Sequence, residues 1–126
     1  MQQRLFTRVL FTAKSTGTLD GVILTGKIEN ISLNGAMISF ENGINFKCGD
    51  NCFLTIYPEG ESYPIRIIAE VVRFLRNMVG IKFVTIDDEN QRCLYELVKR
   101  VATEPENMDE QRERMKQYFA NYFASS

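Results

Sequence analysis

The sequence contains no histidine, no tryptophan and only three cysteines, and the missing histidine excludes the most chemistry. Histidine is the commonest general base and a common metal ligand, so Ser-His and Cys-His catalysis are excluded and a metal site is unexpected. Cys48, Cys52 and Cys93 form no C-x-x-C pair, and their odd number favours free thiols in a reducing compartment. We therefore expect a cytoplasmic protein that is not an enzyme and needs no cofactor.

Long hydrophobic runs and a strong net charge are also missing. No window approaches the roughly 18 apolar residues that cross a bilayer, and the N-terminus lacks the apolar run of a signal peptide. The net charge of -1 lacks the basic footprint of a nucleic-acid binder. The sequence therefore predicts neither membrane insertion nor nucleic-acid binding. The charge is uneven, however, because Arg4, Arg8 and Lys14 lie in residues 1–14 without an acid, which is compatible with a local anion-binding arm.

Alternating apolar residues and turn signals predict a mainly β fold in the first two thirds of the chain. The apolar residues change parity near Glu29, which predicts a bulge or a sharp bend. The expected strands cover 9–14, 21–33, 36–40, 52–57, 63–76 and 78–84, with glycine breaking the chain at 15–18. Short connections between these strands favour a six-stranded antiparallel β-barrel, since closure hides the edges.

After residue 84 the apolar spacing becomes helical. Thr85 and Asp88 resemble a capping box, so a first helix is expected over about 87–102, and Pro105 ends it. A second helix is expected from about Asn107, with an apolar stripe of Met115, Tyr118, Phe119, Tyr122 and Phe123. The stripe could fold back on the barrel, form a homodimer or bind a target protein. This divides the chain into a barrel with its arm and first helix, 1–102, and a helical extension, 103–126.

The stretch from Asn30 to Gly35 joins small polar side chains to a predicted tight turn. In extended structure Asn30 and Ser32 point to one side, and the intervening Ile31 points to the other. The Asn-Gly pair ending at Gly35 predicts a two-residue hairpin turn with positive φ. Gly35 would also leave room for a flat ligand against the backbone. The alternative is an ordinary hairpin whose polar side chains only face water.

Arg4 and Arg8 stand four residues apart, which puts them on one face of either a helix or a strand. The planar guanidinium group binds oxygen atoms in pairs and stacks on aromatic surfaces, so arginine suits a ligand with phosphates and planar bases. The alternative is a pair of solvated surface charges.

The two motifs, R-x-x-x-R at residues 4–8 and N-x-S-x-x-G at residues 30–35, together resemble the signature of the PilZ domain family. The segment Val-Gly-Ile-Lys-Phe-Val at 79–84 also looks like the closing strand of that family. The resemblance covers about residues 3–102 and implies a six-stranded antiparallel barrel followed by a helix. It further implies a bacterial receptor for the second messenger cyclic di-GMP.

The resemblance also assigns roles in ligand binding. Arg4 and Arg8 would wrap over the nucleotide, Asn30 and Ser32 would hydrogen-bond a guanine edge or a phosphate, and Gly35 would allow close backbone approach. Binding would order the N-terminal arm and signal to an unidentified effector protein. Asparagine at position 30 replaces the commoner aspartate, and Gln3 stands where some members have a cation, so ligand stoichiometry is open. The alternative is a ligand-free PilZ-like adaptor, which would lack these motifs.

Overall fold

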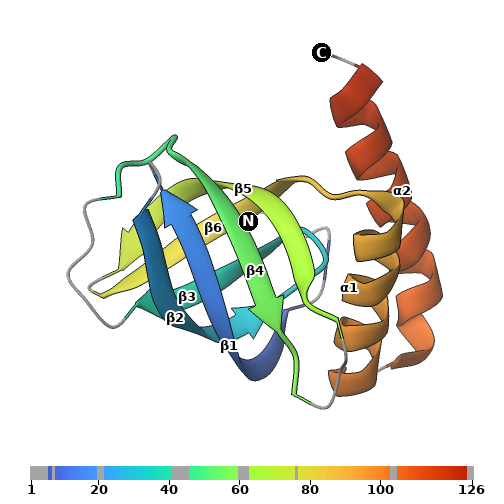
Figure 1. The fold of residues 1–126 in the computed structure, drawn as a ribbon. Helices are drawn as coiled ribbons and strands as arrows, with labels where there is room; N and C mark the ends of the chain where they lie inside the picture. The colour runs from blue at the N-terminus through green and yellow to red at the C-terminus, as the bar shows by residue number, and fades with distance from the viewer. Residues whose placement is uncertain are drawn as a thin grey trace.

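The chain forms a closed β-barrel followed by two helices. The computed structural model describes residues 6, 8–19, 22–40, 46–59, 63–75, 77–102 and 105–124. The strands are β1 (Val9–Leu19), β2 (Val22–Ile31), β3 (Gly35–Phe40), β4 (Asn51–Tyr57), β5 (Ile65–Leu75) and β6 (Met78–Thr85). They are followed by α1 (Asp88–Val101), the 3-10 helix η1 (Pro105–Asn107) and α2 (Met108–Ala124). All neighbouring strands are antiparallel, and the order β1-β2-β3-β6-β5-β4 closes the barrel (Figure 1). The predicted fold class is confirmed.

The first strand is longer than predicted. We expected glycine to break it after Lys14, but β1 continues to Leu19. Ser15 and Gly17 are buried, and a Cβ atom on Gly17 would lie 3.0 Å from Cys52 Sγ and 3.4 Å from the ring of Phe40. Small residues are therefore required here because larger side chains from other strands fill the barrel, so packing overrides the low strand propensity of glycine.

The change of apolar parity in β2 is a real irregularity of the sheet. The pairing of β2 with β3 shifts between Ile28 and Asn30, and Ile28 and Ile31 are both fully buried. Glu29 accepts a hydrogen bond from Ser39 Oγ at 2.7 Å. The predicted bulge near Glu29 is confirmed, and it lies directly before the residues expected to bind ligand.

The three cysteines are free thiols, as predicted. Cys52 is buried on β4, and this burial raises the pKa of its thiol to about 11. Cys52 is therefore a packing group at neutral pH, whereas Cys48 is exposed.

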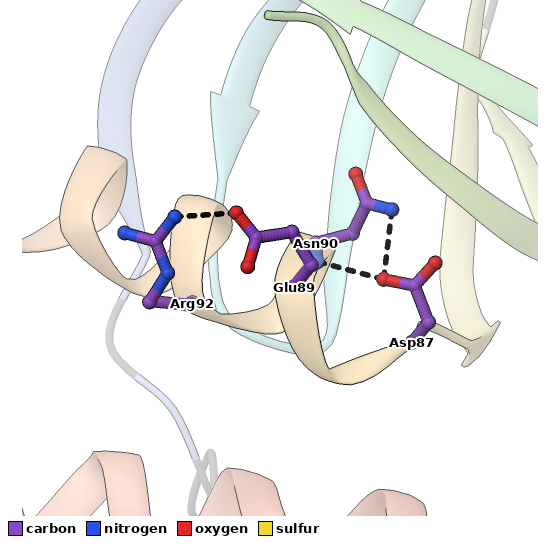
Figure 2. A network of polar contacts seen from close by, with 4 residues as sticks. All are labelled: Asp87, Glu89, Asn90 and Arg92. Atoms are coloured by element: carbon purple, nitrogen blue, oxygen red, sulfur yellow. Dashed lines mark hydrogen bonds and ion pairs between the residues drawn. The ribbon is translucent and has the colours of Figure 1, made fainter.

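The residue that caps the first helix lies two positions after the predicted one. Thr85 pairs with Ile68 in the sheet, and Asp87 caps α1 by accepting a hydrogen bond from Asn90 N at 2.8 Å (Figure 2). Asn90 also accepts a bond from Arg66 N at 2.9 Å, which ties the start of α1 to β5. The Thr85 capping box was wrong because the strand extends to that residue.

The second helix packs on its own chain. Met108, Met115 and Phe119 of α2 are buried in the same apolar cluster as the barrel interior. Tyr95 of α1 donates a hydrogen bond to Asp109 at 2.7 Å, and burial together with that bond raises the pKa of Tyr95 to about 12. Figure 1 shows the two helices side by side at one end of the barrel.

Of the three outcomes considered for the apolar stripe, docking on the same chain is the one observed. The side chains of Tyr122 and Phe123 lie outside the described part of the structure. No helix in the described ranges is long and apolar enough to cross a membrane.

Candidate functional site

The connection between β2 and β3 is closed by hydrogen bonds of its own. Ser32 N donates to Gly35 O at 2.9 Å, and Ser32 Oγ donates to Asn34 Oδ1 at 2.8 Å. Ser32 Oγ also accepts from Asn34 N at 3.2 Å. Asn34 O accepts from Phe83 N at 2.8 Å, so β6 supports the turn from outside. Ser32 is 2% exposed, and its hydroxyl group serves to hold the turn.

The prediction of a two-residue Asn-Gly turn with positive φ was wrong. The connection contains three residues, 32–34, and Gly35 is the first residue of β3, opposite Lys82. Among the described glycines, only Gly49 has a positive φ, of 96°. A Cβ atom on Gly35 would lie 2.6 Å from the carbonyl oxygen of Ile81. Glycine is therefore required at position 35 by close approach to the backbone of β6, and the Ser32 side chain supplies the bend.

The apolar residues of this stretch fill the core, as expected. Ile31 and Leu33 are fully buried in the apolar cluster. Asn30 is half-buried, and its Oδ1 atom is buried without a hydrogen-bond partner in the described part of the chain. Because an unpaired buried acceptor costs about 1–3 kcal/mol, it marks a position where a ligand donor would be stabilising.

Asn30 belongs to a line of cross-strand neighbours that runs over five strands. We call this line the Asn30 row, and its members are Leu10, Asn30, Met37, Gly80 and Arg73, from β1, β2, β3, β6 and β5. No exposed side chain projects from the middle of the row, because Gly80 has no side chain and Met37 is buried. Both ends are exposed, with Leu10 88% accessible to solvent.

Arg8, the second arginine of the N-terminal motif, lies close to the β1 end of this row. Arg8 is exposed and directly precedes Val9, which pairs with Ile31. Continuation of that register places Arg8 at the level of Ser32. The structure therefore brings Arg8 together with the turn at 32–35, whereas Arg4 lies outside the described residues.

Phe6, between the two arginines of the sequence motif, packs against the second helix. Phe6 is 3% exposed and belongs to the apolar cluster of the core. Its ring meets Tyr118 of α2 edge-on, with the ring centroids 6.1 Å apart. The sequence motif gave no indication of this contact, because Phe6 occupies a variable position of R-x-x-x-R. Phe6 thus connects the described part of the motif to the C-terminal helix.

The charges beside the turn are of both signs. Lys82, which pairs with Gly35, forms an ion pair with Glu70 at 3.2 Å, and both side chains are partly exposed. Such a pair contributes little to stability, so Lys82 can exchange its partner at low cost. The described residues contain no group of three acidic, cysteine or histidine side chains suited to a metal ion. The exposed Lys82 therefore adds a cation beside the turn.

Comparisons with known proteins identify the family and the fold. The sequence profile described as PilZ domain matches residues 2–100. A search of curated proteins finds no match.

Solved structures share the fold at low sequence identity. The Bacillus subtilis inhibitor of motility (MotI/DgrA) has a TM-score of 0.68 at 19% identity, over 79% of this chain and 51% of that chain. The PilZ domain of YcgR from Escherichia coli, solved with c-di-GMP, has a TM-score of 0.66 at 15% identity, over 91% and 98%. The PilZ domain of CeSA from a cellulose-synthesizing bacterium has a TM-score of 0.60 at 16% identity, over 73% and 94%. The present chain thus spans about half the length of the Bacillus protein.

Proposed function

The chain belongs to the PilZ domain family, and from this premise we propose that it is a non-catalytic bacterial receptor for cyclic di-GMP that signals to another protein. The observation that supports the proposal most strongly is the position of Arg8 one residue before Val9, the strand partner of Ile31, because Asn30 Oδ1 beside Ile31 has no hydrogen-bond partner in the described residues. The Escherichia coli domain with the same fold, solved with c-di-GMP, gives this ligand as the first to test.

The chemistry of the site matches that of the nucleotide. Guanine offers O6 and N7 as acceptors and its amino group as a donor. Asn30 Oδ1 suits the guanine donors, and the guanidinium groups of Arg4 and Arg8 suit O6, N7 or phosphate oxygens. Ser32 and Gly35 would act by keeping the turn rigid and flat. No bond in the ligand has to break, so the absence of histidine is no obstacle.

The contact between Phe6 and Tyr118 provides a route from the ligand to α2. We propose that the arm carries Phe6 away from α2 when Arg4 and Arg8 fold over the nucleotide. Tyr118 would lose its neighbour, and the surface of α2 would change. An effector protein would recognise that altered surface. A second copy of this chain is the less favoured partner, because Met115 and Phe119 are already buried within one chain.

Calorimetric titration with cyclic di-GMP tests the proposal. We expect a Kd in the micromolar range or below for the wild-type chain, and loss of measurable binding in Arg8→Ala. Arg66→Ala is the matched control, because Arg66 is an exposed arginine on β5 outside the Asn30 row. Its Kd should stay within twofold of the wild-type value.

The absence of heat at millimolar nucleotide, with a folded wild-type chain, would reject the receptor. That result would favour the ligand-free adaptor.

A further inference from the structure

We infer that Arg73 of β5 is an additional ligand-contacting residue, at the opposite end of the Asn30 row from Arg8. This inference rests on the proposed function, because the ligand is the same nucleotide. Arg73 belongs to neither sequence motif. Its role is indicated by a bulge, a glycine and an unusual hydrogen-bond partner.

A bulge in β5 turns Arg73 outward. The odd-numbered residues from Ile65 to Val71 point into the barrel and are buried. Strict alternation would also send Arg73 inward. The pairing of β5 with β6 shifts between Val71 and Arg73, however, so Val72 is an extra residue and Arg73 pairs with Gly80 on the outer face. A bulge that redirects a charged side chain is typical of a binding site.

Gly80 then lets the side chain of Arg73 lie flat across β6. A Cβ atom at position 80 would lie 2.8 Å from Arg73 Cγ, 3.1 Å from Arg73 Nε and 3.1 Å from Met37 Sδ. Any other residue at position 80 would therefore displace the arginine. The arginine reaches over the glycine to β3, where its Nη2 atom lies 3.8 Å from Met37 Sδ.

This path brings the guanidinium group close to Asn30. Met37 is the cross-strand partner of Asn30, and neighbouring strands are about 4.8 Å apart. Met37 lies between the core residues Ala36 and Ile38, so its side chain points to the outer face of the sheet and is not part of the core cluster. It is nevertheless only 4% exposed. The Arg73 side chain covers Met37 on the outer face of the sheet, and a ligand above the Asn30 row would lie against both residues.

The partner of Arg73 is weak for a charged donor. A guanidinium group has five N–H donors, and a thioether sulfur is a poor acceptor. No carboxylate in the described ranges lies within ion-pair distance of Arg73, whereas Lys82 in the adjacent strand has Glu70. The donors of Arg73 are therefore available to guanine O6 and N7 or to phosphate oxygens. A ligand held by Arg8 at one end and Arg73 at the other would be bound from both sides.

The test is calorimetric titration of the full chain with cyclic di-GMP. Arg73→Met keeps an apolar stem over Gly80 and Met37 but removes the donors, so we expect at least tenfold weaker binding with an unchanged melting temperature. Arg73→Lys, which keeps the charge and loses the planar fork, should bind with intermediate affinity. Arg66→Met, on the same strand outside the row, should stay within twofold of the wild type.

The outcomes separate the two proposals. If Arg73→Met binds within twofold of the wild type while Arg8→Ala does not bind, Arg73 only covers Met37 and the inference is wrong, although the receptor stands. If the folded wild-type chain gives no heat, both proposals fail. If Arg73→Met does not fold, Arg73→Gln takes its place under the same criteria.

Discussion

The turn between β2 and β3 is held by hydrogen bonds, whereas Phe6, in the described part of the chain before β1, packs through its aromatic side chain. Ser32 and Asn34 bind each other, and β6 binds the turn through Phe83 N. The described anchor of the N-terminal motif is Phe6, packed against Tyr118. The described contacts of the turn are therefore hydrogen bonds, and the described contacts of Phe6 are apolar.

The magnitudes make release of Phe6 on ligand binding feasible. Truncation of a buried phenylalanine costs about 3–5 kcal/mol, which bounds the cost of releasing Phe6. A micromolar Kd corresponds to about 8 kcal/mol after that cost has been met, so the contacts with the ligand must contribute about 11–13 kcal/mol. Contacts of that size correspond to a Kd of about 1 nM, which lies within the range of known complexes. Opening the turn at 32–35 would break several hydrogen bonds and the strand pairing that follows them. We therefore expect the N-terminal arm, and not the turn, to move on ligand binding.

The largest effect on the free energy of unfolding is expected when Phe6 is removed from the N-terminal arm. Phe6→Ala should lower the free energy of unfolding by about 3 kcal/mol, because it removes a ring that is almost fully buried. Urea denaturation measures this. Leu10→Ala is the control, since Leu10 is 88% exposed and its loss should change stability by less than about 0.5 kcal/mol. If Phe6→Ala lowers the free energy of unfolding by less than about 1 kcal/mol, other residues must hold the N-terminal arm in place.

A somewhat smaller loss is expected when the turn is pushed away from β6. Gly35→Ala should cost about 2 kcal/mol, because its Cβ would lie 2.6 Å from the Ile81 carbonyl oxygen, a backbone atom. Gly80→Ala is the matched control, since the nearest atom there, at 2.8 Å, belongs to the flexible Arg73 side chain. Thermal unfolding of both variants measures the two losses of stability. Equal losses would contradict the claim that the turn is fixed against backbone.

Removal of the hydroxyl group inside the turn should have a moderate effect. Ser32→Ala should lower the free energy of unfolding by about 1 kcal/mol, because Asn34 loses a hydrogen bond at both its backbone N–H and its side chain. Denaturant unfolding measures this. Ser39→Ala is the control, since Ser39 forms its hydrogen bond with Glu29 on the outer face of the sheet and not within the turn. A neutral Ser32→Ala would show that strand pairing alone forms the turn.

The smallest effect on stability is expected at the residue that best fits the ligand. Asn30→Ala should cause no loss in the free energy of unfolding, because removal of a buried acceptor that has no partner in the described residues offsets the packing lost with the side chain. Its affinity for cyclic di-GMP should fall at least tenfold. Calorimetry and denaturation on the same sample measure both. A large stability loss with unchanged affinity would assign Asn30 to the fold instead of the ligand.

Sequence patterns predicted the barrel because apolar alternation reports which face of a strand is buried. The same pattern predicted the bulge at Glu29, since Ile28 and Ile31 have opposite parity and both lie in the core. It failed where a long-range neighbour decides the local structure. Gly17 continues β1 because Phe40 and Cys52 fill the space beside it, and neither is close to it in sequence.

The candidate site was predicted in part. The two motifs led to Arg8 and to the 30–35 stretch, which the fold does bring together. The prediction of a two-residue turn was wrong, because the Asn-Gly pattern does not report the hydrogen bonds of the Ser32 hydroxyl. Arg73 was missed, although adjacent Val71 and Val72 break the alternation just before it and could have signalled the bulge. The docking of α2 was left open because an apolar stripe does not identify what covers it.

Closure of the barrel also limits how an effector can bind. Each of the six strands has a neighbour on both sides over part of its length, so the sheet has no edge strand in the described ranges for a foreign strand to extend. Recognition by addition of a strand to a free sheet edge, which tolerates many sequences, is therefore disfavoured. A partner has to read side chains, and its choice of target will depend on individual residues at the surface.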